Sequence, residues 1–219
     1  MGSGRKKTSI KWRLAQFLEI RWWQQYLRKK GKEEYLEAKR AYWQRVLDRL
    51  DLEVPDAAHV LDAGCGPAGI FMILPRREVV AVDPLLAAYA EKLAHFSPER
   101  YPWVHFETMM LEAYQAPKLF DYVFCLNAIN HVADLRAGIS VVAKATKPEG
   151  QLIISIDTHR FWGLKWLFRL LPGDALHPHQ HSLADYEALL QQQGFSLTQK
   201  VKLKPGWIFD YWILVLEKA

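Results

Sequence analysis

The stretch Val60 to Gly69, VLDAGCGPAG, holds the residues of this chain best suited to bind a ligand. Its glycines, Gly64, Gly66 and Gly69, have the G-x-G-x-x-G spacing of a turn whose backbone can approach a ligand closely. Asp83 ends the next apolar run, about 20 residues further on, where an acid can accept hydrogen bonds from ribose hydroxyls. The pattern therefore predicts a site for a nucleoside-containing cofactor.

A second carboxylate distinguishes between two kinds of cofactor. Asp62 lies two residues before the first glycine, and its charge would repel the pyrophosphate of a dinucleotide. The same charge suits S-adenosylmethionine, which carries no phosphate and has a cationic sulfonium and ammonium. We therefore expect a methyl donor in this loop, and an NAD-dependent oxidoreductase is the disfavoured alternative.

The pattern of apolar runs predicts the elements that position these residues. From residue 58 onward, short strands over 59–63, 78–82, 103–106, 121–126 and 151–156 alternate with helical segments, and a helix is expected near 183–193. Two further runs, SLTQKVKL and IFDYWILVL, flank a Pro-Gly turn and predict an antiparallel hairpin. The fold class expected is α/β, a doubly wound, Rossmann-like, mostly parallel seven-stranded sheet ending in that hairpin.

Two N-terminal helices are expected before the sheet, over 8–30 and 33–50. The second has one clean apolar stripe, whereas the first is apolar nearly all round. The predicted organisation is a basic, aromatic helical segment over 1–56, acting as a lid or a surface-binding element, followed by the cofactor domain over 57–219.

The motifs D-A-G-C-G-P-A-G at 62–69, Asp83 and F-D-Y-V-F-C-L-N at 120–127 resemble those of the class I S-adenosylmethionine-dependent methyltransferases. The resemblance covers about residues 57–219 and implies the same cofactor. It implies that Asp62, Gly64 and Gly66 border the methionine moiety, Cys65 and Ala68 contribute backbone, Asp83 binds the ribose, Pro84 and Leu85 flank the adenine, and Asn127 lines the methionine end.

One departure from the family pattern follows the third strand. Many relatives carry an acid there, near the adenine amino group, whereas this chain has Thr108-Met109-Met110-Leu111 with Glu112 just beyond. We therefore expect the adenine to contact backbone groups and the apolar side chains of Met110 and Leu111.

Methyl transfer also calls for a base that removes a proton from the acceptor, and histidine is the usual choice. His131, four residues after Asn127, is the first candidate, and His159 after the fifth strand is the second. The alternative for His131 is a structural role between helices. The HPHQH stretch at 177–181 places three imidazoles on one side of an extended chain, but no fourth ligand is evident, so no metal is expected and a loop bordering the substrate is favoured.

Charge and aromatic content bear on the substrate. Residues 1–50 hold 14 Lys and Arg against 5 Asp and Glu, so the excess of the +5 chain lies there. Aromatic residues in that segment and in 159–182 favour a hydrophobic or aromatic small molecule. The alternative is action at a membrane surface on a lipid or quinone-like substrate, through peripheral contact of 8–30 and 161–171.

Other readings of the sequence are less favoured. RNA is one, since basic residues with aromatics also suit single strands; however, Asn127-Ala128-Ile129-Asn130 replaces the D/N-P-P-aromatic sequence of base N-methylating enzymes. A domain that binds cofactor without catalysis is another. The sequence does not determine which atom is methylated or the oligomeric state.

Features of the whole chain suggest its compartment. No apolar run reaches the ~18 residues that cross a bilayer, and the start lacks the apolar stretch of a signal peptide. Cys65 and Cys125 are expected as buried free thiols. We expect a cytoplasmic protein, with peripheral association at the inner membrane surface under the membrane alternative.

Overall fold

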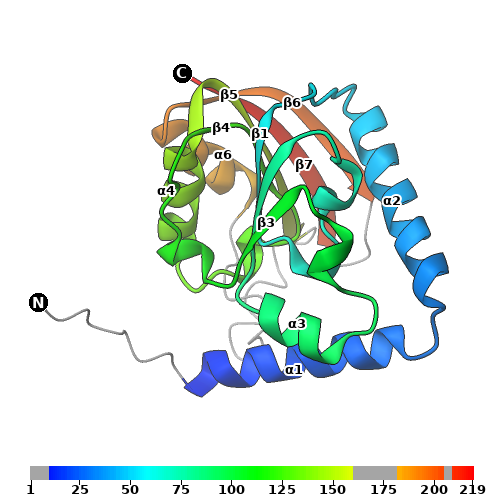
Figure 1. Ribbon diagram of the computed structural model, residues 1–219. Helices are drawn as coiled ribbons and strands as arrows, with labels where there is room; N and C mark the ends of the chain where they lie inside the picture. The colour runs from blue at the N-terminus through cyan, green and yellow to red at the C-terminus, as the bar shows by residue number, and fades with distance from the viewer. Residues whose placement is uncertain (1–9, 160–181, 205–208) are drawn as a thin grey trace, which may run out of the picture.

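A computed structural model describes residues 10–159, 182–204 and 209–219, and its centre is one seven-stranded sheet in the order β3-β2-β1-β4-β5-β7-β6 (Figure 1). The strands are β1 (His59–Ala63), β2 (Glu78–Val82), β3 (Val104–Glu107), β4 (Phe120–Cys125), β5 (Thr146–His159), β6 (Phe195–Lys204) and β7 (Phe209–Lys218). Strands β1 to β5 are parallel, and β7 is antiparallel to both β5 and β6. The predicted fold class is confirmed.

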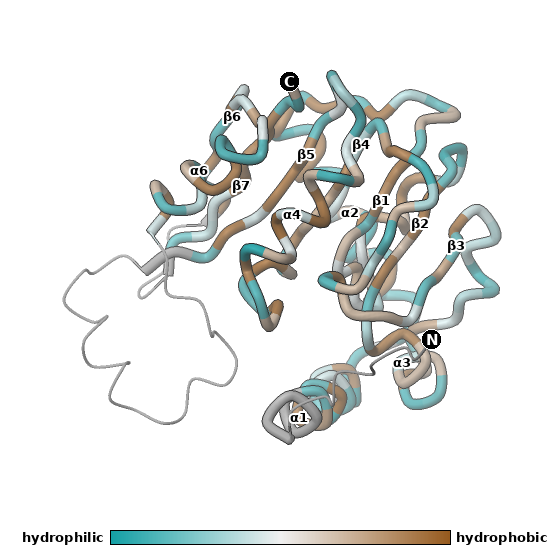
Figure 2. Tube along the Cα trace, turned by 90° about the vertical axis from the view of Figure 1, so that its left-hand side faces the viewer, coloured by the Kyte–Doolittle hydropathy of each residue, from teal (hydrophilic) through white to brown (hydrophobic). Residues whose placement is uncertain are grey.

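The central strands are apolar because both faces of the sheet are covered. Alternate residues enter two separate cores, since successive side chains of a strand point to opposite faces. Val60, Ala81, Phe124 and Ile153 enter one core, and Leu61, Val80, Val123 and Ile154 enter the other. Figure 2 shows the apolar strands in the interior of the molecule.

The helices described are α1 (Ile10–Leu27), α2 (Lys32–Arg49), α3 (Leu86–Lys92), α4 (Leu135–Ala145) and α6 (Leu183–Gln192). Helix α2 lies on one side of the sheet, and α4 and α6 lie on the other (Figure 1). The predicted stripe of α2 is buried through Tyr35, Leu36, Trp43, Val46 and Leu47. Helix α1 crosses the molecule next to α3, at the edge where the parallel strands end (Figures 1 and 2).

The connection between β1 and β2 differs from the predicted alternation of strands and helices. Its residues form two 3₁₀ turns, η1 (Gly66–Ala68) and η2 (Ile70–Ile73), and no α-helix. Pro67 has no amide hydrogen for a helical bond, and the amide of Phe71 donates to the Asp62 carboxylate instead. Helix α2 packs against η2 and covers this face. The expectation of a helix here is therefore wrong, and residues 64–77 supply no α-helix N-terminus that could bind a pyrophosphate.

Helix α1 has apolar residues on two faces, as predicted. Ile20 and Leu27 are buried and join the core of the sheet, while Phe17, Leu18, Trp22 and Tyr26 are exposed. Because α1 and α2 share that core, they pack as part of the same body as the sheet. The proposed boundary between residues 56 and 57 stays a prediction.

Two smaller expectations can also be compared with the described residues. Cys65 and Cys125 are free and buried, as predicted. None of the helices in the described ranges is long and apolar enough to span a membrane. The Pro-Gly turn between β6 and β7 lies outside the described residues.

Candidate functional site

Three loops converge where neighbouring parallel strands end. The glycine loop follows β1, the segment from Asp83 follows β2, and the segment from Leu126 follows β4. From β1 the chain proceeds to β2 and β3 on one side, and then to β4 and β5 on the other. This reversal of strand order is the place where open α/β sheets bind ligands. The sequence-predicted cofactor residues thus meet at one edge.

The three glycines meet different surroundings. Gly64 has φ +76°, and a Cβ there would lie 2.2 Å from the Cβ of Ala128, so it lets the β1 and β4 loops touch. A Cβ on Gly69 would lie 2.4 Å from Oδ2 of Asp62. Gly66 has φ +57°, and a Cβ there would meet nothing within 4 Å. Among the three, Gly66 is the position where the loop leaves space for a ligand.

Asp83 lies beside that space with both carboxylate oxygens oriented. Its Oδ2 accepts from the amide of Gly66 at 3.0 Å, and its Oδ1 accepts from the amide of Leu85 at 2.8 Å. Burial raises the pKa of the Asp83 carboxyl to about 7. A held carboxylate next to an open glycine fits the ribose diol of a nucleoside cofactor, whose hydroxyls need acceptors.

Asp62 lies one strand away and points into the loop that follows the glycines. Its side chain is buried, and Oδ2 accepts from the amide of Phe71 at 3.1 Å. Burial raises the pKa of this carboxyl also to about 7. The structure therefore gives Asp62 a loop-holding contact. Its contact with the methionine end of the cofactor stays a prediction.

Helix α2 fixes the far end of the glycine loop. The indole Nε1 of Trp43 donates to the carbonyl of Ala68 at 2.9 Å in a buried contact. The amide of Cys65 donates to the carbonyl of Val82 at 3.2 Å. The backbones of Cys65 and Ala68 are therefore engaged with protein partners. The stripe of α2 predicted burial for Trp43, but no sequence signal identifies the partner of its indole.

The residues expected near the adenine differ in exposure. Pro84 and Met110 are half-buried, whereas Leu85 and Leu111 are buried. Leu111 packs in the core that α4 covers, so its side chain serves the fold. The adenine contacts predicted for these four residues stay predictions.

Glu112, the acid that follows the third strand, has a structural partner. Its Oε1 accepts from the amides of Ala133 and Asp134 at 2.6 and 3.3 Å. This carboxylate therefore supports the turn that leads into α4. The sequence left its role undefined, because a carboxylate that binds backbone amides has no characteristic spacing.

Asn127 begins the β4 loop in a left-handed conformation with φ 55°, which asparagine tolerates better than most residues. Its amide donates to Oγ of Ser155 at 2.7 Å. Asn130 is buried nearby: its Nδ2 donates to the carbonyl of Asp157, and its Oδ1 accepts from the hydroxyl of Tyr186, both at 3.2 Å. These bonds fix the loop to β5 and α6. Sequence reasoning missed Asn130.

The candidate bases differ in how far the structure describes them. His131 ends the turn η5 (Ile129–His131), and its side chain is exposed at the edge where the cofactor residues gather. His159 is the last residue of β5, paired with Phe209, and its side chain lies outside the described residues. The stretches 161–171 and HPHQH at 177–181 also lie outside them. The described residues contain no cluster of metal ligands.

Comparison with known sequences gives the family. The sequence model of a methyltransferase domain matches residues 35–200. The chain belongs to the methyltransferase domain family. The family model and the fold make it a class I methyltransferase, for which S-adenosylmethionine is the methyl donor.

Curated relatives cover part of this methyltransferase. The ubiquinone biosynthesis O-methyltransferase of Idiomarina loihiensis is 35% identical over 151 residues, which cover 63% of this chain and 60% of the relative. That of Rickettsia akari is 30% identical over 117 residues, covering 52% and 43%. The matched region is thus about half the length of these relatives.

Solved structures share the fold. The 1,6-didemethyltoxoflavin-N1-methyltransferase of Burkholderia thailandensis, solved with 1,6-didemethyltoxoflavin and S-adenosylhomocysteine, superposes with a TM-score of 0.61 over 96% of this chain and 91% of its own. Its sequence identity is 17%. This likeness concerns the fold alone.

Proposed function

We propose that this methyltransferase transfers the methyl group of S-adenosylmethionine to a hydrophobic, aromatic small molecule of the quinone-like class. The observation that carries the cofactor part is the open space at Gly66 beside the oriented carboxylate of Asp83. The names of the curated relatives, ubiquinone biosynthesis O-methyltransferases, support the substrate class.

The chain's own residues would act by binding, alignment and proton removal. Asp83 accepts hydrogen bonds from the ribose, while Asp62 and Asn127 lie at the adjoining strand ends. S-adenosylmethionine supplies the electrophilic methyl group when bound. The transfer is an in-line displacement, so alignment of the acceptor with the methyl group lowers the barrier. His131 is the proposed base for an acceptor hydroxyl, with His159 as the second candidate.

Calorimetry with S-adenosylmethionine, S-adenosylhomocysteine and NAD tests the cofactor. We expect micromolar binding of the first two and none of NAD. Methyl transfer from labelled cofactor is then measured on a prenylated dihydroxybenzoate, an unprenylated one, and a single-stranded RNA. Transfer to the prenylated phenol supports the proposal. Cofactor binding without transfer to any aromatic acceptor contradicts the substrate class and favours a non-catalytic domain.

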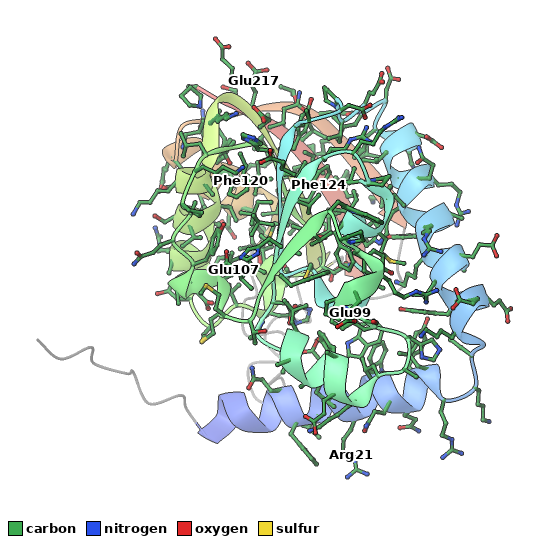
Figure 3. All side chains as sticks on the ribbon, in the orientation of Figure 1. Arg21, Glu99, Glu107, Phe120, Phe124 and Glu217 are labelled. Carbon is green, nitrogen blue, oxygen red and sulfur yellow. The ribbon has the colours of Figure 1, made fainter. Side chains whose placement is uncertain are left out.

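A second candidate adds action at an anionic membrane surface, and the outer face of α1 favours it. Trp22 and Tyr26 are exposed, and their rings stack at 5.0 Å. The guanidinium of Arg21 lies over Phe17, the ammonium of Lys30 lies over Tyr26, and Arg21 points away from the body of the molecule in Figure 3. Aromatic rings flanked by cations suit the headgroup region of anionic lipid.

Flotation with vesicles tests the membrane candidate. We expect the protein to float with vesicles of phosphatidylglycerol and phosphatidylcholine, and less with phosphatidylcholine alone. The double variant Trp22→Gln, Tyr26→Gln should lose flotation. Leu119→Gln is the control, because Leu119 is also an exposed large apolar residue. Equal flotation of the double variant and the control contradicts the role of α1.

A further inference from the structure

Helix α1 reaches the cofactor site through one carboxylate. The hydroxyl of Tyr89, on α3, donates to Oε1 of Glu19 at 2.9 Å. Tyr89 is fully buried, whereas Glu19 is exposed. A buried donor thus holds an exposed carboxylate. Glu19 is the single acid of α1.

The packing around Tyr89 keeps α1 in this position. The ring of Trp23 meets the ring of Tyr89 edge-on, with centroids 6.4 Å apart. Ile20 is buried in the same core as Tyr89. Trp23 follows Glu19 by four residues, about one helical turn, so both side chains lie on the face of α1 that meets Tyr89 of α3.

Backbone hydrogen bonds connect Tyr89 to Asp83: the amide of Tyr89 donates to the carbonyl of Leu85, and the amide of Leu85 donates to Oδ1 of Asp83, both at 2.8 Å. Burial is the largest cause of the raised pKa of the Asp83 carboxyl, and the charge of Glu19 raises it further. Burial also raises the pKa of Tyr89, with the charges of Asp83 and Glu19 acting in the same direction. Tyr89 therefore connects the Glu19 carboxylate of α1 with the segment after β2 that carries Asp83.

We propose that Glu19 belongs to the cofactor site: its carboxylate, held by Tyr89, joins Asp83 as an acceptor for the hydrogen-bond donors of the cofactor ribose. This inference rests on the proposed use of S-adenosylmethionine. It makes α1 a part of the site and not only a cover for the sheet or a membrane contact.

The proposal implies that cofactor binding and the docking of α1 are energetically coupled. Two neighbouring carboxylates repel each other, and a ligand that donates hydrogen bonds to both relieves the repulsion. Cofactor binding therefore strengthens the docking of α1, and by linkage the docked helix strengthens cofactor binding to the same degree.

The variant Glu19→Gln tests the charge alone, because a glutamine oxygen can still accept from Tyr89. Affinity for S-adenosylhomocysteine is measured by calorimetry from pH 5.5 to 8.5 in wild type, Glu19→Gln and Glu37→Gln. Glu37, on the exposed face of α2, is the matched control for net charge. We expect Glu19→Gln to bind about tenfold more weakly, because a hydrogen bond to a charged acceptor is replaced by a weaker one to a neutral acceptor, and Glu37→Gln to match wild type.

The pH dependence separates this role from a structural one. The ionisable groups that interact with Asp83 are Asp62 on β1, Cys65 in the glycine loop, Glu19 on α1 and Tyr89 on α3. In wild type the affinity should rise with pH as Asp83 ionises. In Glu19→Gln this rise should move to lower pH, because one like charge has been removed.

Limited proteolysis supplies a readout apart from affinity. Trypsin cleaves after Arg21 and Arg28, and S-adenosylhomocysteine should slow cleavage in wild type more than in Glu19→Gln. The proposal is overturned if Glu19→Gln binds S-adenosylhomocysteine with the affinity and the pH dependence of wild type. It is also overturned if S-adenosylhomocysteine does not change the rate of cleavage of α1 in wild type. Failure of wild type to bind either cofactor form overturns the proposed function itself.

Discussion

At the scale of single residues, two glycines of the loop have different requirements. Gly64 needs its positive φ and the absence of a side chain against Ala128. Gly66 shares the positive φ but faces open space. These two positions therefore separate the demands of folding from those of ligand binding.

Alanine substitutions at the two glycines should differ in effect. Both variants adopt a left-handed backbone, which costs roughly 1–2 kcal/mol for a residue with a Cβ. Gly64→Ala adds the clash with Ala128, roughly another 1–3 kcal/mol of overpacking. Gly66→Ala should keep more stability but lose cofactor affinity, because its methyl fills the ligand space. Urea unfolding and calorimetry measure both, and equal stability of the two variants contradicts the clash.

His131 is expected to act on the acceptor and not on the cofactor. His131→Ala should lower kcat by about 10²–10⁴, the usual contribution of a general base, and leave the affinity for S-adenosylhomocysteine within about twofold. His105→Ala is the control, since His105 is an exposed histidine of β3. Steady-state kinetics with the best acceptor measures the effect. Near-normal kcat in His131→Ala would assign the residue a structural role.

At the scale of elements, α2 stabilises the cofactor loop from outside the strands that carry it. The Trp43 indole and the Ala68 carbonyl form a buried hydrogen bond. Trp103 makes a similar bond to the Phe71 carbonyl at 3.1 Å, in a partly buried place. The Phe71 carbonyl also accepts from the amide of Leu74 at 3.3 Å, so it has a second donor besides the Trp103 indole.

Removing the indole of α2 should loosen the loop. Trp43→Phe leaves the Ala68 carbonyl buried without its donor, which costs about 1–3 kcal/mol. Because that carbonyl is in the cofactor loop, affinity for S-adenosylmethionine should also fall. Trp103→Phe, at the partly buried bond, should cost less. Urea unfolding and calorimetry compare the two; a larger stability loss in Trp103→Phe would contradict the ranking.

At the scale of the whole molecule, two buried carboxyls shape stability against pH. Burial raises the pKa of Asp62 and of Asp83 to about 7, against about 3.9 in an unfolded chain. The folded state therefore binds more protons in this range. The stabilising contribution of these protonated groups is complete below about pH 4 and is lost as the pH rises through about 7.

The free energy of unfolding of the ligand-free protein should therefore fall between about pH 4 and about pH 7. Glu33 and Glu78 act in the opposite direction: hydrogen bonds from Arg100 and Lys118 lower their pKa values. Their contribution is lost only at more acid pH. Urea unfolding at pH 5.0, 6.0 and 7.5 measures the slope, which should flatten in Asp83→Asn. A wild-type stability that rises over this range would contradict the argument.

The sequence by itself determined the strands and the identity of the loop. Predicted bounds of β1 and β2 agree with the structure, because short apolar runs between turn residues have few other ways to bury themselves. The glycine spacing, Asp62 and Asp83 predicted the edge at which the cofactor is expected, since ligand binding needs particular residue types at fixed spacing. The amphipathic stripe of α2 was equally readable.

Only the tertiary structure decided which groups meet across the chain. Three contacts join residues far apart in sequence: Trp43 with Ala68, Asn130 with Tyr186, and Glu19 with Tyr89. The replacement of a helix by 3₁₀ turns after β1 is local, at Pro67. Such contacts depend on how elements pack in three dimensions, and no periodicity or local propensity encodes them. For this methyltransferase, the sequence predicted the ligand loop, and the packing of α2 decided which side chain holds it.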